Sequence, residues 1–168
     1  TVKLVVTDEE GLTGLATISV KINEKDSFIH RDFREENVYF MMTDRFADGD
    51  KNNNNLWGDE YLPNGESQMY DFNESKTGIL SYYHGGDFKG IIDNLDYLVD
   101  MGFTAIWITP SVKQAEGRFY YGDYEASAFH GYWGYDFDKI DPHLHSSGKD
   151  SDGWADYKAM VDACHAKG

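Results

Sequence analysis

The chain has 168 residues, of which 15 are basic and 30 are acidic, so its net charge at pH 7 is −15. Phosphate groups are repelled by so negative a chain, which argues against nucleic acid and anionic membrane surfaces as partners. Hydrophobic residues make up 40% and charged residues 27%, as in a globular protein, and no apolar run is long enough to span a membrane. The single cysteine, Cys164, excludes an internal disulfide.

Residues 1–22 alternate between apolar and polar side chains on both sides of a turn-rich link at 7–14. This period of two predicts a β-hairpin. The pattern Val-Thr-Asp-x-x-Gly-Leu-Thr-Gly resembles the last two strands of an immunoglobulin-like module of the polycystic-kidney-disease or cadherin-like type. We therefore assign 1–24 to the C-terminal hairpin of such a module and 25–36 to a linker. An unrelated surface hairpin is the alternative.

From residue 37 the pattern becomes strand, helix, strand, helix. The apolar runs Val38–Met42 and Thr104–Pro110 predict strands buried on both faces. Ile91, Leu95 and Leu98 recur at helical spacing before Gly102, and a second helix is predicted to begin near Ser151 or Asp152 and to end at Gly168. This order predicts parallel strands with crossover helices, and long loops at 44–86 and 111–150 that follow the strands. Parallel α/β folds place their sites at those strand ends.

The loop after the first strand is rich in hard oxygen donors. Between Thr43 and Asn55 it carries Asp44, Asp48, Asp50 and a run of four Asn residues. Carboxylate and amide oxygens at this spacing suit Ca²⁺, and soft ligands are absent. A solvated Asn-rich loop is the plain alternative. An EF-hand-type loop that starts at Asp48 is weaker, because Asn53 stands at the glycine position and Asp59 at the final glutamate position.

The second long loop carries nine aromatic residues between Phe119 and Phe137. Sugar rings have apolar faces that stack on aromatic rings, and hydroxyl groups that pair with His and Asp, so this mixture favours a neutral glycan. Most of the nine are expected to serve packing. His130, Tyr132 and Trp133 are the better candidates for ligand contact, because the glycines beside them let the backbone approach closely.

Four segments of 37–168 resemble, in order, the start of the α-amylase family, glycoside hydrolase family 13. They are Val38–Gly49, Gly85–Ile91, Gly102–Pro110, and His130–Trp133 with Asp136-Phe137 and Asp141-Pro142. The closest branch is that of cyclodextrin glucanotransferases and extracellular amylases. The resemblance implies an α/β fold, with 37–168 as the first two βα units of an incomplete (β/α)₈ TIM barrel. It also implies retaining chemistry on α-1,4-glucans such as starch, and secretion.

The resemblance implies site residues as well. Its Ca²⁺ ligands would be Asp48, Asp50, Asn53, Asn54, Gly85 through its backbone, and Asp87. Asp50 stands where that branch usually has Asn, and the Asn run leaves Asn52 or Asn55 as possible substitutes. Tyr132 would stack under the sugar beside the scissile bond, with His130 and Trp133 as its neighbours.

The family's catalytic carboxylates would follow later strands, so the sequence predicts no catalytic residue within these 168 residues and no hydrolysis by this chain alone. Asp136 and Asp141 match no catalytic position and are expected to be structural. The leading hypothesis is therefore a longer α-glucan-active enzyme, since both chain ends look cut. The alternatives are a non-catalytic glycan-binding relative and a calcium-dependent adhesion or spacer protein.

Overall fold

The computed structural model describes residues 2–7, 9–18, 32–54, 56–57, 81–121 and 124–168. The chain divides into two compact units, Thr1–Phe33 and Arg34–Gly168. In the first unit, strands β1 (Val2–Thr7) and β2 (Thr13–Ile18) pair antiparallel, with Thr7 opposite Thr13. The predicted hairpin is present. Its later apolar residues, Val20 and Ile22, lie outside the described residues, and its membership of an immunoglobulin-like module stays a prediction.

The second unit is built on one parallel strand pair. Strand β3 (Val38–Met41) pairs with β4 (Ala105–Ile108), as the strand–helix–strand order predicted. Short helices flank β3: the 3-10 helix η2 (Phe33–Glu35), within the predicted linker, and α1 (Thr43–Phe46). The predicted first helix is two helices, α2 (Phe88–Asp93) and α3 (Leu95–Asp100), separated at Asn94, and Gly102 follows with φ +85°.

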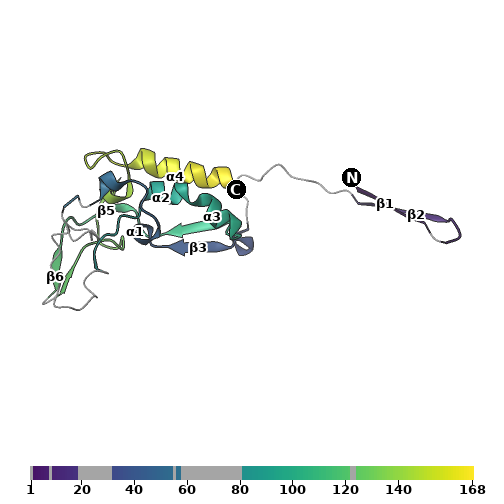
Figure 1. Ribbon diagram of the computed structural model, residues 1–168, viewed down its shortest axis with the longest axis horizontal. Coiled ribbons are helices and arrows are strands. Elements are labelled where there is room, and N and C mark those ends of the chain that lie inside the picture. The colour runs from purple at the N-terminus through teal and green to yellow at the C-terminus, as the bar shows by residue number, and fades with distance from the viewer. Residues whose placement is uncertain (1, 8, 19–31, 55, 58–80, 122–123) are drawn as a thin grey trace. The chain divides into compact units, whose positions relative to one another are not determined.

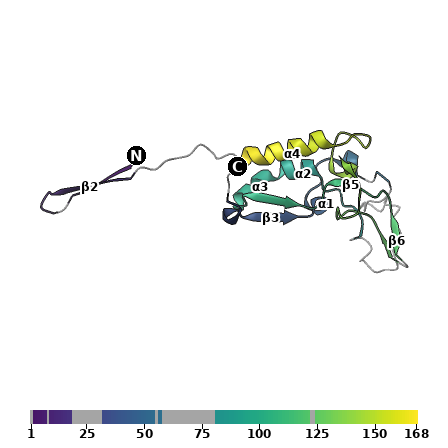
Figure 2. The ribbon, with the colours of Figure 1, turned by 180° about the vertical axis from the view of Figure 1, so that it is seen from behind.

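Helix α4 (Trp154–Lys167) begins two to three residues later than predicted and lies with α2 and α3 on one side of the β3–β4 sheet (Figures 1 and 2). The core forms between these helices and the sheet. Its buried side chains are Met41, Phe88, Ile91, Leu95, Leu98, Ile140, Leu144 and Met160. Tyr157, Val161 and Cys164 of α4 pack against it, whereas Trp154 stays 42% exposed and donates its indole N–H to Asp138 O.

The prediction that both strands are buried on both faces is wrong for this structure. Phe40 and Trp107, opposite each other in the pair, are 56% and 63% exposed and contact edge-to-face at 5.8 Å. Their neighbours in sequence point to the other face, where Met41 is buried under the helices. Side chains alternate along a strand, so the helical layer covers one face of this sheet and leaves the other to Phe40 and Trp107.

The predicted loop at 111–150 contains regular structure. Strand β5 (Val112–Gln114) pairs antiparallel with β8 (Gly134–Ile140), and β6 (Phe119–Tyr121) pairs with β7 (Tyr124–Ala126). A 3-10 helix, η5 (Pro142–Leu144), follows β8. The aromatic residues that we took for a ligand-binding loop are also strong strand formers, which explains the two additional strand pairs. In the first loop, a 3-10 helix, η3, spans Lys51–Asn53.

Candidate functional site

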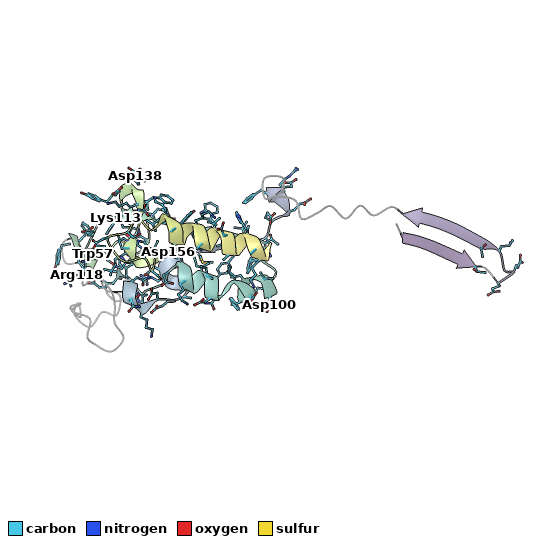
Figure 3. The ribbon with its side chains drawn as sticks, turned by 90° about the horizontal axis from the view of Figure 1, so that it is seen from above. Trp57, Asp100, Lys113, Arg118, Asp138 and Asp156 are labelled. Atoms are coloured by element: carbon cyan, nitrogen blue, oxygen red, sulfur yellow. The ribbon has the colours of Figure 1, made fainter. Side chains whose placement is uncertain are left out.

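The loops that follow β3 and β4 gather at one end of the second unit. Figure 3 shows Trp57, Lys113 and Arg118 at the end opposite Asp100, the last residue of α3. This is the carboxyl end of the parallel strands, where the sequence predicted the site. The candidate ligand-binding groups form two neighbouring sets, an aromatic pocket and a cation loop.

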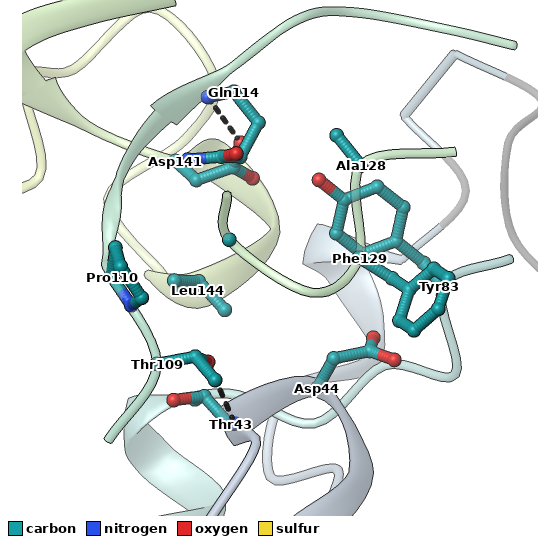
Figure 4. Close-up of a pocket in the computed structure, with 11 residues that line it drawn as sticks. Thr43, Asp44, Tyr83, Thr109, Pro110, Gln114, Ala128, Phe129, Asp141 and Leu144 are labelled. Atoms are coloured by element: carbon teal, nitrogen blue, oxygen red, sulfur yellow. Dashed lines mark hydrogen bonds between the residues drawn. The ribbon is translucent and has the colours of Figure 1, made fainter. Parts of the chain in front are cut away.

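The pocket lies between α1, the end of β4 and the turn at 128–131. Asp44, Tyr83, Gln114, Phe129 and Asp141 are among its lining residues (Figure 4). Thr43 N donates to Thr109 Oγ1 at 3.4 Å and links the segments that follow the two strands. The pocket is therefore bordered by polar groups from both strand ends and by aromatic rings.

Asp44 ties α1 to the segment before α2. Its side chain is buried, and Oδ1 accepts hydrogen bonds from His84 N at 2.8 Å and Gly85 N at 3.2 Å. Arg45 Nε lies 2.6 Å from Asp44 Oδ2. Burial raises the pKa of Asp44 to about 6, against the opposing effects of the two backbone hydrogen bonds and the Arg45 charge. The Arg45 guanidinium also lies 4.1 Å from the centre of the Phe129 ring, so α1 holds the aromatic side of the pocket too.

Asp141 is the second buried carboxylate of the pocket. It accepts hydrogen bonds from His143 N at 3.0 Å and Gln114 N at 2.9 Å, and His143 Nδ1 lies 2.9 Å from Oδ1. Burial acts to raise its pKa, but the hydrogen bonds and charge of His143 and the Gln114 N–H outweigh burial and lower it. The His143 ring stacks on Tyr83 at 3.7 Å. Asp141 thus joins β5 to η5 through hydrogen bonds, and its structural role stays a prediction.

The predicted sugar-contact residues lie together on one turn. Gly131 has φ +84°, and a Cβ atom there would lie 2.4 Å from Pro110 O, so the turn passes directly over the end of β4. The His130 ring lies 4.7 Å from the Trp133 ring and 5.8 Å from the Tyr132 ring. Tyr132 is 62% exposed, whereas His130 and Trp133 are half-buried. We call residues 130–133 the aromatic turn.

The expectation that most of the nine aromatic residues serve packing stays a prediction, because the structure describes the burial of seven of them. Tyr120, Tyr132, Tyr135 and Phe137 are exposed, and Phe119, Phe129 and Trp133 are half-buried. The side chains of Tyr121 and Tyr124 lie outside the description.

Hydrogen bonds and close contacts link the six predicted cation ligands in two sets, one of Asp48, Asn54 and Gly85 and one of Asp50, Asn53 and Asp87. Asn54 Nδ2 donates to Asp48 Oδ2 at 3.0 Å, and Asn53 Nδ2 donates to Asp87 Oδ2 at 3.0 Å. The Asn54 amide packs against Gly85, where a Cβ atom would lie 2.8 Å from Asn54 Nδ2. Asp50 N donates to Asp87 Oδ2 at 2.8 Å, so Asp50 is linked to Asn53 through Asp87.

Asp87 organises this loop. It is fully buried and accepts four hydrogen bonds, from Gly49 N and Gly90 N at Oδ1 and from Asp50 N and the Asn53 amide at Oδ2. A carboxylate offers about four acceptor positions, so all of them are used. Burial raises the pKa of Asp87, and these four hydrogen bonds oppose the rise. The same residue caps the N-terminus of α2, so the loop and the helix share one anchor.

Two oxygen atoms in the loop favour a cation. Within the described residues, the buried Asn53 Oδ1 and Asn54 Oδ1 have no hydrogen-bond partner. A buried acceptor without a donor is costly, and a hard cation would satisfy it. No group of three or more His, Cys, Asp or Glu side chains in the described ranges could hold a metal, so amide and backbone oxygens would carry much of the coordination. The residues present therefore fit Ca²⁺ better than a transition metal.

The register of the Asn run favours Asn53 and Asn54 over Asn52. Asn53 is buried, whereas Asn52 is exposed and donates its amide to Asp50 Oδ1 at 2.8 Å. Asn55 and the last EF-hand position, Asp59, lie outside the described residues. The segment is flanked by the four-residue helix α1 and contains η3, which differs from the two long helices of an EF-hand.

Comparison with known proteins decides the family. The alpha-amylase catalytic domain family matches residues 40–168, which is most of the chain. The chain belongs to the alpha-amylase family. Among its relatives, a beta/alpha-amylase of Paenibacillus polymyxa is 41% identical over 116 residues, covering 69% of this chain and 8% of the relative. The periplasmic alpha-amylase of Escherichia coli is 30% identical over 148 residues, covering 86% of this chain and 19% of the relative.

Solved structures agree with this assignment. A gamma-CGTase from the alkalophilic Bacillus clarkii matches with a TM-score of 0.62 and 33% identity, over 81% of this chain and 17% of that one. An alpha-amylase from Geobacillus thermoleovorans, complexed with acarbose, matches with a TM-score of 0.52 and 31% identity, over 82% and 22%. This alpha-amylase family chain thus spans less than a quarter of each of these four proteins. No helix in its described part is long and apolar enough to cross a membrane.

Two contributors to the site were missed by sequence reasoning. Gln114 supports the backbone of the aromatic turn, and its neighbours in sequence carry no motif that would have identified it. The stacking of His143 on Tyr83 joins segments 60 positions apart in the chain and has no local signature. The Asp141-Pro142 pair did carry a signal, because Asp followed by Pro is a common helix start.

Replacing Asp87 by Ala should destabilise the alpha-amylase unit by about 3 kcal/mol or more, because four donors, two of them in buried and two in part-buried hydrogen bonds, lose their acceptor. The free energy of unfolding from denaturant titration measures the effect. Asp93→Ala, at an exposed residue paired with Lys89, is the matched control and should change stability by less than about 0.5 kcal/mol. Equal losses for both variants would contradict the anchoring role of Asp87.

The pKa of His130 should lie below 6.5, because partial burial disfavours its charged form. Its Nδ1 accepts the Tyr132 N–H at 3.0 Å, which requires an unprotonated Nδ1. The stability that this residue contributes is therefore complete above pH 6.5 and is lost as the pH falls through the lowered pKa. NMR titration of the ring measures the pKa. His130→Asn keeps an acceptor without titrating and should flatten the pH dependence, and a measured pKa above 6.5 would refute the prediction.

Proposed function

We propose that the protein carrying this chain is a retaining, α-glucan-active glycoside hydrolase of the α-amylase type. In this proposal β3 and β4 are the first two strands of a (β/α)₈ barrel, and the exposed face with Phe40 and Trp107 belongs to the barrel interior. The chain supplies the cation loop and part of the substrate pocket. Catalytic carboxylates would come from later strands, about 5–5.5 Å apart as in retaining enzymes.

The aromatic turn is the observation that carries the proposal. It places the exposed Tyr132 ring beside His130, on the turn whose Gly131 lines the pocket. Because His130 Nδ1 accepts the Tyr132 N–H, the neutral ring carries its proton on Nε2, which can donate to a sugar hydroxyl. A stacking ring next to a hydrogen-bond donor suits a neutral sugar. The acarbose complex of the Geobacillus thermoleovorans alpha-amylase supports an oligosaccharide ligand.

We propose a Ca²⁺ ion in the cation loop, held by Asp48, Asp50, Asn53, Asn54 and the backbone of Gly85. Asp87 would contribute mainly by orienting these groups, since its acceptor positions are used by four donors. A bound cation would satisfy the orphan amide oxygens and hold the loop against η5, where Asn53 Nδ2 already reaches His145 O at 3.4 Å. An extracellular location is also proposed, and the periplasmic relative from Escherichia coli supports a site of action outside the cytoplasm.

The non-catalytic alternative is not favoured by the relatives, since those named above are amylases or a glucanotransferase. The adhesion alternative gives no reason for the aromatic turn. The net charge of −15 supports a neutral glycan over a nucleic acid or an anionic membrane surface as the partner.

In the full-length protein, activity on soluble starch should depend on Tyr132. Removing the ring with Tyr132→Ala should lower kcat/KM at least about tenfold, because the sugar loses its stacking surface. Tyr97→Ala removes an equally exposed ring from α3 and should leave kcat/KM unchanged. Absence of starch hydrolysis by the wild-type protein, together with a reading frame that lacks Asp, Glu and Asp after strands four, five and seven, would refute the enzyme proposal.

Chelation should lower the melting temperature of the full-length protein, and Ca²⁺ but not Mg²⁺ should restore it. At a free Ca²⁺ concentration 100 times the Kd, the stabilisation would be about 2.7 kcal/mol. Asp48→Ala should remove this Ca²⁺-dependent shift, whereas Asp93→Ala should keep it. If chelator does not change the melting temperature of the wild-type protein, a stabilising Ca²⁺ ion is excluded.

A further inference from the structure

The Gln114 side chain completes an interrupted strand pairing. Strand β5 pairs irregularly with β8, because the register shifts on both sides of Lys113. Gln114 is 3% exposed, its Nε2 donates to Val112 O at 2.6 Å, and its Oε1 accepts the Trp133 N–H at 2.7 Å. The side chain thus takes the place of a backbone acceptor that a regular ladder would have provided.

The backbone around Gln114 is itself anchored. Gln114 N donates to Asp141 Oδ2 at 2.9 Å (Figure 4), and Asp141 is 2% exposed. The next residue, Ala115, donates its N–H to Trp133 O at 3.0 Å. Both backbone groups of Trp133 are therefore bonded to residues 114 and 115, and the buried Asp141 carboxylate holds that segment in place.

Only an amide side chain of this length meets both requirements at position 114. Glutamate would place a carboxylate oxygen against the carbonyl oxygen of Val112, and leucine would remove both hydrogen bonds. Trp133 in turn packs edge-on against His130 and Phe119, and Tyr132 precedes it in the turn. A shift of the Trp133 N–H would therefore shift the rings of the aromatic turn.

We propose that Gln114 is a positioning residue: both polar atoms of its side chain are used to hold the aromatic turn, and the aromatic turn sets the affinity for the α-glucan. This inference rests on the proposed function. Binding energy that is equal in the ground state and the transition state affects KM and leaves kcat unchanged. Gln114 therefore acts on KM through Tyr132 and its neighbours.

Steady-state kinetics of the full-length protein on soluble starch test the inference with Gln114→Glu and Gln114→Leu. KM should rise about three- to tenfold in both variants, while kcat changes less than about twofold. The matched control is Asn94→Asp, which breaks another amide-to-carbonyl hydrogen bond, from Asn94 Nδ2 to Gly90 O at 2.8 Å, between α2 and α3. The control should lower the melting temperature and leave KM unchanged. Unchanged KM in folded Gln114 variants would overturn the inference.

A second measurement separates positioning from general destabilisation. In a Tyr132→Ala background the KM effect of Gln114→Glu should largely disappear, because the ring that Gln114 positions is gone. The same fold-increase in both backgrounds would overturn the inference. If neither variant folds, Gln114→Asn keeps both hydrogen-bonding groups on a shorter side chain and carries the same expectation. A wild-type protein without α-glucan activity would overturn the proposed function and this inference together.

Discussion

The loops at the carboxyl ends of β3 and β4 depend on one kind of interaction, a buried carboxylate that accepts hydrogen bonds from the backbone. Irregular segments leave backbone N–H groups without regular partners, and each such group must be satisfied if it is buried. Asp44, Asp87 and Asp141 do this for three segments that are distant in sequence. The acidic residues of the chain thus help to fold its loops as well as to repel anions.

Each of the three carboxylates stabilises a different segment of the two parts of the site. Asp87 joins the cation loop to α2, and Asp141 joins β5 to η5 beneath the aromatic turn. Asp44 lies in the pocket and holds the segment that leads into α2. Because each is buried, its loss would leave several donors unsatisfied at once. This arrangement makes the proposed sugar site and the proposed cation site parts of one hydrogen-bonded framework.

Membership of the alpha-amylase family gives this framework a context. Strands β3 and β4 form a parallel pair, and the helices cover one face of it. The opposite face carries Phe40 and Trp107. In a closed barrel that second face would be interior, which is the simplest reason for apolar residues on both sides of these strands. The pocket and the cation loop lie at the strand ends where barrel enzymes place their sites.

The sequence by itself determined the parallel pairing of β3 and β4 with helices between and after them, the position of the two loops and the candidate residues for a sugar or a cation, but not the four short strands β5 to β8. Apolar periodicity and the clustering of Asp, Asn and aromatic residues are local properties, so they could be read from the chain. Tertiary structure decided which groups are buried and which partners they find. Examples are the four donors to Asp87 and the link from Asp141 through Gln114 to Trp133. The contact between Phe40 and Trp107 is another. These contacts join residues up to about 70 positions apart. No local pattern encodes such contacts, because they arise only when the strands and loops pack together.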